Sequence, residues 1–259
     1  MTSYAFNEEG DRVVLVVFHD RKDCTTKVLC HEAFHAMDYI AAQYGLDYNP
    51  DIYPTHGLGP LCMILGIGKT DHLAWLTSFA TKAVGLRQHM SEDDTTPITL
   101  GDIISTQIET QGGTLISLTH DTTLPRPRSL DFEVQGSLGI WDGVNRRIYL
   151  EEMNSETWQD DHAILALYES REWQLWGEKA LKHDSHHQGM DYIMLRCVAA
   201  ELTKNASADS AGSIRYPATL SDLALWTSVT LLSEISIREH RRVAFGYSSD
   251  LQYKKNKNL

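Results

Sequence analysis

The sequence is poor in cysteine and has no long apolar run. Its four cysteines, Cys24, Cys30, Cys62 and Cys197, form no C-x-x-C pair and have no regular spacing. They therefore indicate neither a zinc ribbon nor a dense disulfide framework, and we expect reduced thiols. No stretch approaches the roughly 18 consecutive apolar residues of a membrane-spanning helix. With 259 residues, the chain is long enough for one large or two modest globular domains.

Basic residues are the minority among the charged ones. The chain has 23 Lys and Arg against 35 Asp and Glu, which gives a formal charge of −12. Nucleic acids and anionic membranes reward clustered positive charge, so we expect neither as a partner, whereas a neutral sugar is indifferent to this charge. The first residues, Met1 to Glu9, lack the basic start and apolar run of a signal peptide. The sequence as written predicts a cytoplasmic protein.

A glycine-rich dinucleotide fingerprint is also missing. No G-x-G-x-x-G follows a predicted strand, and the glycine pairs Gly57/Gly59 and Gly66/Gly68 do not lie in the strand-to-helix turn of a βαβ unit. That turn is the part of a Rossmann domain that cradles the phosphates of a dinucleotide. The sequence therefore predicts no Rossmann domain in these residues and no evident phosphate cradle for NAD.

The front of the chain predicts a strand followed by a helix. Residues Arg12 to His19 form a continuous β-branched run, typical of a strand buried on both faces. Thr25 to Tyr44 has apolar residues at helical spacing, with threonines at its start and Gly45 at its end. From Asp47 to Pro60, a high density of Asn, Pro, Asp and Gly predicts a connection between two segments.

Beyond this connection the pattern changes from strands to helices. Alternating and β-branched stretches predict a meandering sheet with a turn at Gly112-Gly113. The predicted strands are Leu73 to Lys82, Asp102 to Glu109, Thr114 to Thr119, Asp131 to Gln135 and Arg147 to Glu151. The predicted helices are Asp160 to His183, Met190 to Lys204 and Ser221 to His240. This order indicates an α+β fold, with an open and mainly antiparallel sheet packed by helices.

An HExxH motif, His31-Glu32-Ala33-Phe34-His35, lies within the first predicted helix. One helical turn would put both imidazoles on the same face, where they could share a zinc ion while the glutamate polarises a water. The surrounding residues, Val28 to Ile40, resemble the active-site helix of small phage-type zincin proteases. The nearby candidates for a third ligand are Asp47, Asp51 and His56, and none lies in a zincin pattern.

The octapeptide Tyr53 to Pro60, YPTHGLGP, places a phenol, a hydroxyl and an imidazole between prolines and glycines. The prolines fix φ at about −65° and the glycines permit positive φ, so the pattern predicts a tight turn that holds a site. Further along the chain, His120 and Asp121 are neighbours on a predicted strand and therefore point to opposite faces. We expect one of them to be buried and the other to face the cleft.

The octapeptide and several later motifs resemble glycoside hydrolase family 109, the NAD-dependent α-N-acetylgalactosaminidases of the Gfo/Idh/MocA oxidoreductase architecture. In chain order the motifs are Tyr53 to Pro60, Leu100 to Ile108, Leu118 to Pro127, Val134 to Trp141, His187 to Tyr192 and Ser233 to Ile237. The resemblance implies the substrate-binding C-terminal half of that architecture, without its dinucleotide-binding domain.

The resemblance also implies a chemistry. In the family, NAD takes and returns a hydride while a base removes a proton from the sugar. Tyr53 and His56 would be the catalytic pair, and Arg128 stands where the family has a tyrosine that contacts substrate. His187 and Asp191, four residues apart, could form a polar pair at the cleft edge or only cap a helix. The residues predicted to bind substrate are Tyr53, Pro54, Thr55, His56, Arg128, His187 and Asp191.

These observations predict three segments and leave several functions open. Residues 1–48 could be a foreign N-terminal segment joined by gene fusion, 49–247 the family 109-like substrate domain, and 248–259 a disordered tail. The first function is an α-N-acetylgalactosaminidase-like glycosidase domain, impaired on its own, that binds an N-acetylgalactosamine-type glycan and depends on NAD. The alternatives are a zinc metallopeptidase using His31 and His35, and a non-catalytic sugar-binding or interaction domain. Homo-oligomers could form through the exposed sheet or domain face.

Overall fold

The computed structural model describes most of the chain from residue 48 onward and three short segments before it. The described residues are 3–6, 13–16, 27–33, 48–88, 92, 95, 97–121, 124–127, 129–153, 156–183, 189–203 and 218–246. For the three short segments only the backbone is described. The predicted tail over 248–259 lies outside the described residues.

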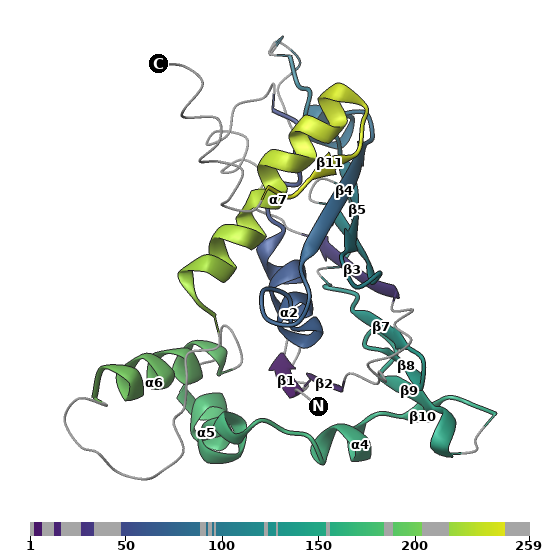
Figure 1. Cartoon of the computed structure of the whole chain (residues 1–259). Coiled ribbons are helices and arrows are strands. Elements are labelled where there is room, and N and C mark those ends of the chain that lie inside the picture. The colour runs from purple at the N-terminus through teal and green to yellow at the C-terminus, as the bar shows by residue number, and fades with distance from the viewer. Residues whose placement is uncertain are drawn as a thin grey trace, which may run out of the picture.

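Nine strands form one open sheet in the described part of the chain, in the order β10-β9-β8-β7-β3-β6-β5-β4-β11 (Figure 1). The strands are β3 (Lys27–Ala33), β4 (Leu73–Ala80), β5 (Ile103–Thr110), β6 (Leu115–Asp121), β7 (Glu133–Gly136), β8 (Gly139–Asp142), β9 (Arg147–Leu150), β10 (Gln159–Asp160) and β11 (Val243–Ala244). Every neighbouring pair is antiparallel except β3 and β6. A separate hairpin pairs β1 (Ser3–Phe6) with β2 (Val13–Val16).

The predicted helix from Thr25 to Tyr44 is wrong where it can be compared, because Lys27–Ala33 is the interior strand β3. This strand pairs with β6 on one side and with β7 on the other. The two ladders satisfy the backbone groups that a helix would have paired internally, so long-range pairing overrides the local spacing. Successive residues of a strand point to opposite faces, and the helical face required by HExxH does not form there. His35 lies outside the described residues.

The helices are α2 (Thr55–Leu65), α3 (Gly85–Gln88), α4 (His162–Ala166), α5 (Arg171–His183), α6 (Met190–Thr203) and α7 (Leu220–Glu239), with the 3-10 turn η1 (Glu151–Met153). The predicted helix from Asp160 to His183 is thus two helices, whereas the other two predicted after the sheet are confirmed within a residue. None of the described helices is both long and apolar enough for a membrane span. The α+β class with an open, mainly antiparallel sheet is confirmed.

Helices α2 and α7 cover one face of the sheet (Figure 1). On that face Leu76, Ile108 and Ile116 lie side by side on β4, β5 and β6, because the register pairs each with the next. Each such buried aliphatic side chain contributes about 1.5–3 kcal/mol relative to an exposed one. The largest fully buried side chains are Leu58, Leu61, Leu73, Leu76, Ile104, Ile108, Ile116, Ile148 and Val229. The core therefore lies between this sheet face and the two helices.

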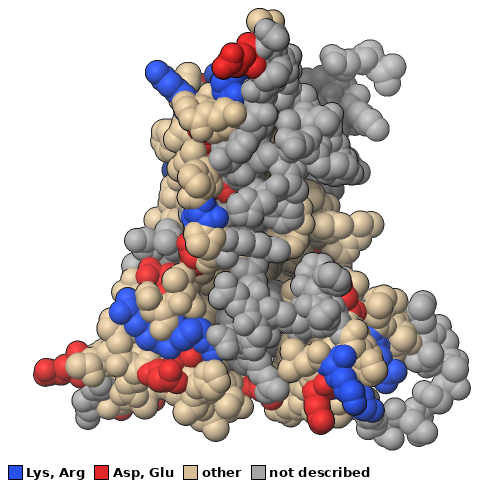
Figure 2. Space-filling model, turned by 180° about the vertical axis from the view of Figure 1, so that it is seen from behind, with Lys and Arg blue, Asp and Glu red and all other residues tan. Residues whose placement is uncertain are grey.

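The opposite face of the same strands carries exposed aromatic residues. Phe79 is 64% exposed and Trp75 42% exposed, and both lie on β4 on the face away from α7. The guanidinium of Arg242 lies 4.7 Å from the Trp75 ring centroid and pairs with Glu109. From behind, basic and acidic side chains lie next to one another among the described residues, without a broad area of one sign (Figure 2).

Candidate functional site

The octapeptide Tyr53 to Pro60 begins helix α2 rather than forming the predicted turn. Pro54 occupies the N-cap with φ −72°, and the first helical bond runs from the Leu58 N–H to the Pro54 carbonyl, 2.8 Å. A proline is tolerated at a helix start because the first N–H groups have no partner within the helix. Gly59 serves close packing and not a positive φ, since a Cβ built there would lie 3.1 Å from the Trp226 ring of α7. The predicted turn is therefore wrong, although the segment does position candidate site residues.

Tyr53 and His56 lie together at this helix start. The Tyr53 hydroxyl and His56 Nε2 are 3.4 Å apart, and the ring centroids are 4.6 Å apart with a tilt of 31°. His56 is exposed, Tyr53 and Thr55 are partly buried, and Pro54 is buried. The phenol and the imidazole are thus close enough to offer polar atoms to one ligand, and their role in binding stays a prediction.

A small recess adjoins Tyr53, one member of this pair. Its lining residues come from the α2 start and from strand β6: Asp51, Tyr53, Pro54, Gly57, Leu118, Thr119 and His120. The recess is partly open to solvent and encloses room for only about one water-sized group, far less than the roughly 300 Å³ at which ligand pockets usually begin. It fits one polar group or small substituent of a ligand and not a whole saccharide.

The polar residues of the recess floor are Asp51 and His120. Their side chains are almost fully buried, and Asp51 Oδ1 lies 3.8 Å from His120 Nδ1. Burial raises the pKa of Asp51 to about 7, and the backbone N–H of Tyr53, which donates to the carboxyl, opposes that rise. Near neutral pH this carboxyl is therefore present in both protonation states. A carboxyl with such a pKa in a recess is typical of a functional site.

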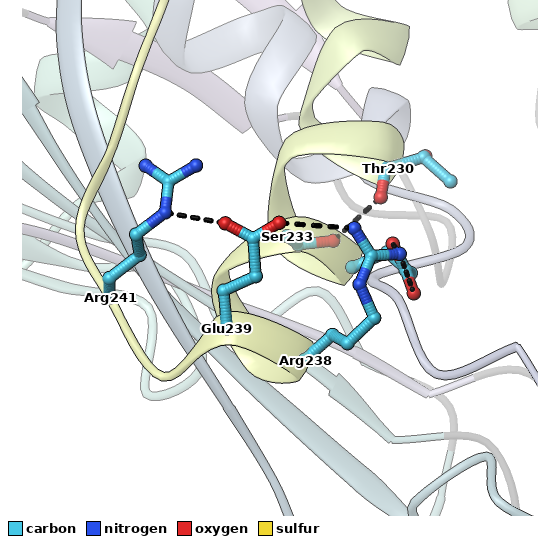
Figure 3. Close-up of polar contacts among 6 residues, drawn as sticks. Thr230, Ser233, Arg238, Glu239 and Arg241 are labelled. Atoms are coloured by element: carbon cyan, nitrogen blue, oxygen red, sulfur yellow. Dashed lines mark hydrogen bonds and ion pairs between the residues drawn. The ribbon is translucent and has the colours of Figure 1, made fainter.

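Helix α7 fixes the segment that carries these residues. The backbone N–H of Asp51 donates to Ser233 Oγ at 2.9 Å, and Ser233 Oγ donates to the Thr230 carbonyl at 2.9 Å, as Figure 3 shows for the serine. One helical turn on, Ser236 Oγ accepts from the Ser78 N–H of β4 at 2.9 Å. The Ser-Glu-Ile-Ser-Ile motif therefore connects α7 to both the site segment and the sheet.

The remaining predicted substrate residues are not brought to the recess. Asp191 is exposed on α6, which packs on α5 away from the start of α2 (Figure 1). Arg128 and His187 lie outside the described residues. His120 and Asp121 lie on opposite faces of β6 as predicted, but both are buried, and only His120 lines the recess.

Asp51 and His120 were not among the residues predicted to bind substrate. The sequence pointed to Asp51 only as a nearby candidate for a third zinc ligand, and to His120 only as one of two neighbours on a strand. A signal for Asp51 was its position three residues before Pro54, where a carboxylate can accept backbone N–H groups at a helix start. No local signal points to the His120 contact, because 69 positions in the sequence separate His120 from Asp51.

A zinc centre on the HExxH motif is not supported, since His31 and Glu32 lie on strand β3 and not on a helix. The described residues do bring Asp160, Asp161 and His162 within 4.8 Å of one another. Asp161, however, already accepts from Trp141 Nε1 and pairs with Arg146. The metallopeptidase alternative is therefore not supported.

Relatives of known family share most of the chain. The profile of the family described as Glycosyl hydrolase 109, C-terminal domain, matches residues 13–245. A family 109 protein of Stenotrophomonas maltophilia is 33% identical over 204 residues, covering 75% of this chain and 43% of that protein. A Tannerella forsythia protein named alpha-N-acetylgalactosaminidase is 32% identical over 204 residues, covering 75% and 41%. The chain thus spans less than half the length of these curated relatives.

Solved structures agree on the fold. An oxidoreductase from Pseudomonas syringae aligns with a TM-score of 0.54 at 14% identity, covering 87% of this chain and 57% of that one. A super-repressor mutant of Gal80p from Saccharomyces cerevisiae aligns with a TM-score of 0.53 at 12% identity, covering 86% and 58%. These neighbours have the Gfo/Idh/MocA oxidoreductase fold. Because the family profile spans most of its length, the chain belongs to glycosyl hydrolase family 109 and matches that family's C-terminal domain.

Proposed function

We propose that this chain is the substrate-binding part of an α-N-acetylgalactosaminidase-type glycosidase and binds an N-acetylgalactosamine-type glycan at the start of α2. The observation that carries the proposal is the Tyr53–His56 pair, whose tyrosine lines a recess together with Asp51 and His120. Membership of family 109, and the name of the Tannerella forsythia relative, supply the sugar class.

The two side chains of the pair have different tasks in this proposal. The phenol donates a hydrogen bond to a sugar hydroxyl, and the imidazole, the more exposed of the two, accepts or donates a proton. Pro54 and Thr55 fix the backbone between them. Asp191 and His187 are not needed for this proposal, and Arg128 stays a predicted substrate contact.

The expectation of NAD dependence rests on the family and not on any residue of this chain. The sequence has no G-x-G-x-x-G, and the described residues place no glycine-rich turn between a strand and a helix of a βαβ unit. The residues present therefore do not fit a dinucleotide, and we assign none of them to it. We expect the purified chain to bind sugar without tightly held NAD, and one equivalent of NAD after purification would contradict this expectation.

A binding experiment tests the proposal directly. Calorimetric titration with methyl α-N-acetylgalactosaminide should give saturable binding, and Tyr53→Phe or His56→Gln should weaken it by roughly fivefold or more, the equivalent of one hydrogen bond. The matched controls are Tyr192→Phe and His183→Gln, which alter another tyrosine–histidine ring pair, on α6 and α5. Equal affinity in all variants, or no binding by the parent chain, would refute the proposed site.

Association is a second candidate role, favoured by the exposed face of the sheet. Phe79, Trp75 and Leu115 are all at least 42% exposed and lie on the face opposite α7. Apolar groups gathered on one surface often mark a contact between proteins. Sedimentation of the parent chain and of Phe79→Ser over a range of concentrations tests this role, and a concentration-independent monomer in the parent would rule it out.

A further inference from the structure

Asp51 lies at the junction of three elements and contacts each of them. Its backbone N–H donates to Ser233 Oγ of α7, and its carboxyl accepts the backbone N–H of Tyr53 at the start of α2. Its Oδ1 atom lies 3.8 Å from His120 Nδ1 of β6. Asp51 thus joins α7 through its backbone N–H, and it joins the sheet and the segment that presents the Tyr53 phenol through its carboxyl.

The Asp51 carboxyl is also part of the recess. The residue is 1% exposed, and its Oδ1 has no hydrogen-bond partner among the residues that the structure describes. A buried carboxyl oxygen without such a bond is costly to ionise, and burial raises the pKa of Asp51 to about 7. A modest change around this carboxyl is enough to alter its charge at neutral pH.

We propose that Asp51 is a positioning residue of the sugar site, whose carboxylate, next to His120, holds the Tyr53 backbone and thereby the phenol above the recess. The inference rests on the proposed function, because it takes Tyr53 as a sugar contact. An ionised carboxylate accepts an N–H more strongly than a neutral carboxyl does. The charged form therefore holds Tyr53 in place, and protonation of Asp51 weakens that hold.

Several other titratable groups face this pair and enter the test. His120 lies next to Asp51 on β6, Tyr53 lines the same recess, and His56 contacts Tyr53. On α7 the group in contact is Ser233, while the neighbouring Glu234 pairs with Arg238. On β3 the backbone of Glu32 stands opposite His120 in the strand register. His56 can add a pH dependence of its own, so the experiment must separate it from Asp51.

The first measurement uses the whole chain without sugar. The amide resonance of Tyr53, whose N–H donates to Asp51, is followed by NMR from about pH 5 to about pH 8. We expect it to titrate in the parent chain and in His56→Gln, and to stay constant in Asp51→Asn. Asp71→Asn is the matched control, because Asp71 also accepts backbone N–H groups, from His72 and Gly112, at the other end of β6. A Tyr53 amide that does not titrate, or that titrates equally in Asp51→Asn, overturns the inference.

The second measurement adds methyl α-N-acetylgalactosaminide. If sugar binding lowers the pKa of Asp51 by about one unit, affinity rises by up to about tenfold across the same pH range. Asp51→Asn should remove that rise, whereas Asp71→Asn should keep it. A rise that persists unchanged in Asp51→Asn overturns the inference. A Tyr53 amide that titrates in a chain binding no sugar at any pH supports the Asp51 hold and overturns the proposed function instead.

Discussion

Two regions of the molecule differ in which side chains they bury. Where α2, β6 and α7 meet, polar groups are buried: Asp51, His120, Ser233 and Ser236 are each at most 3% exposed. Along α4, α5 and α6, which extend below the sheet in Figure 1, apolar groups are exposed, and Leu167 and Leu195 reach 78% and 62%. The corner of the three elements therefore depends on partners distant in sequence, whereas the helical arm depends on local spacing.

The difference shows where stability and chemistry are concentrated. The Asp51–Ser233 bond joins residues 182 positions apart, so it exists only after the chain has folded around it. Buried polar groups that are paired in this way specify one arrangement, because an unpaired one is expensive. Exposed leucines do little to fix the position of a helix, since they lose no contact when the helix shifts. Substitutions in the corner should therefore cost far more than equivalent ones in the arm.

Trp226→Ala should have the largest effect. Trp226 is 9% exposed, and its ring packs on Gly59 of α2, so truncation leaves a cavity between the two helices. We expect a loss of about 3–5 kcal/mol in the free energy of unfolding, measured by urea denaturation. The matched truncation in the arm, Leu195→Ala, should cost less than about 0.5 kcal/mol. Similar losses at the two positions would remove the distinction between corner and arm.

Asp51→Asn should change how stability depends on pH. The pKa of Asp51 is 3.8 in the unfolded chain and about 7 in the folded one, because burial disfavours the charge. The folded state keeps the proton while the unfolded state loses it, so this stabilisation is fully present below about pH 4 and falls as pH rises towards 7. Because of this group, the free energy of unfolding of the parent chain should fall by roughly 2–3 kcal/mol between about pH 5 and about pH 8, and Asp51→Asn should abolish that fall. Parallel stability curves for parent and variant would contradict the raised pKa.

Local patterns were sufficient for most of the sheet and for the last helices. Alternation along β4 and β5 and helical spacing along α7 each reflect one buried face, so they could be read from single segments. The first predicted helix failed because β3 is paired on both edges, which no local pattern shows. The predicted turn at Tyr53 failed because Gly59 of α2 packs closely against Trp226, a residue far along the chain.

In the candidate site, too, some residues could be predicted from a local motif and others are brought together only by long-range packing. Tyr53 and His56 could be predicted because both lie in one short motif, and the helix start holds them together. Asp51 and His120 could not be predicted as a pair, because only the packing of the Asp51 segment on β6 brings them to 3.8 Å. Asp191 was predicted from a motif whose helix, α6, packs in the arm and not at the recess. The boundaries at residues 48 and 248, and the cytoplasmic location, stay predictions.

Ser233→Ala should change the free energy of unfolding less than Trp226→Ala or Asp51→Asn does, but more than any surface substitution. It removes the acceptor for the Asp51 N–H and leaves a buried donor without its partner. The expected loss is about 1–3 kcal/mol in unfolding free energy. Ser228→Ala is the control on the same helix, since the Ser228 hydroxyl bonds only within its own helix, to the Leu225 carbonyl, among the contacts that the structure describes. If both variants lose the same stability, the serine merely satisfies α7 and does not hold the site segment.

Glu234→Gln should have the smallest effect, although Glu234 belongs to the most charged cluster of α7. Figure 3 shows that Arg238, Glu239 and Arg241 carry several ion pairs beside Ser233, and Arg238 Nη1 lies 2.8 Å from Glu234 Oε2. Arg238 is 58% exposed, however, so water screens the attraction and holding its long side chain costs entropy. We expect less than about 0.5 kcal/mol, falling further when NaCl is raised from about 0.1 M to about 1 M. A loss as large as that of Ser233→Ala, insensitive to salt, would mean that surface charge and not the single buried bond fixes α7 over the site.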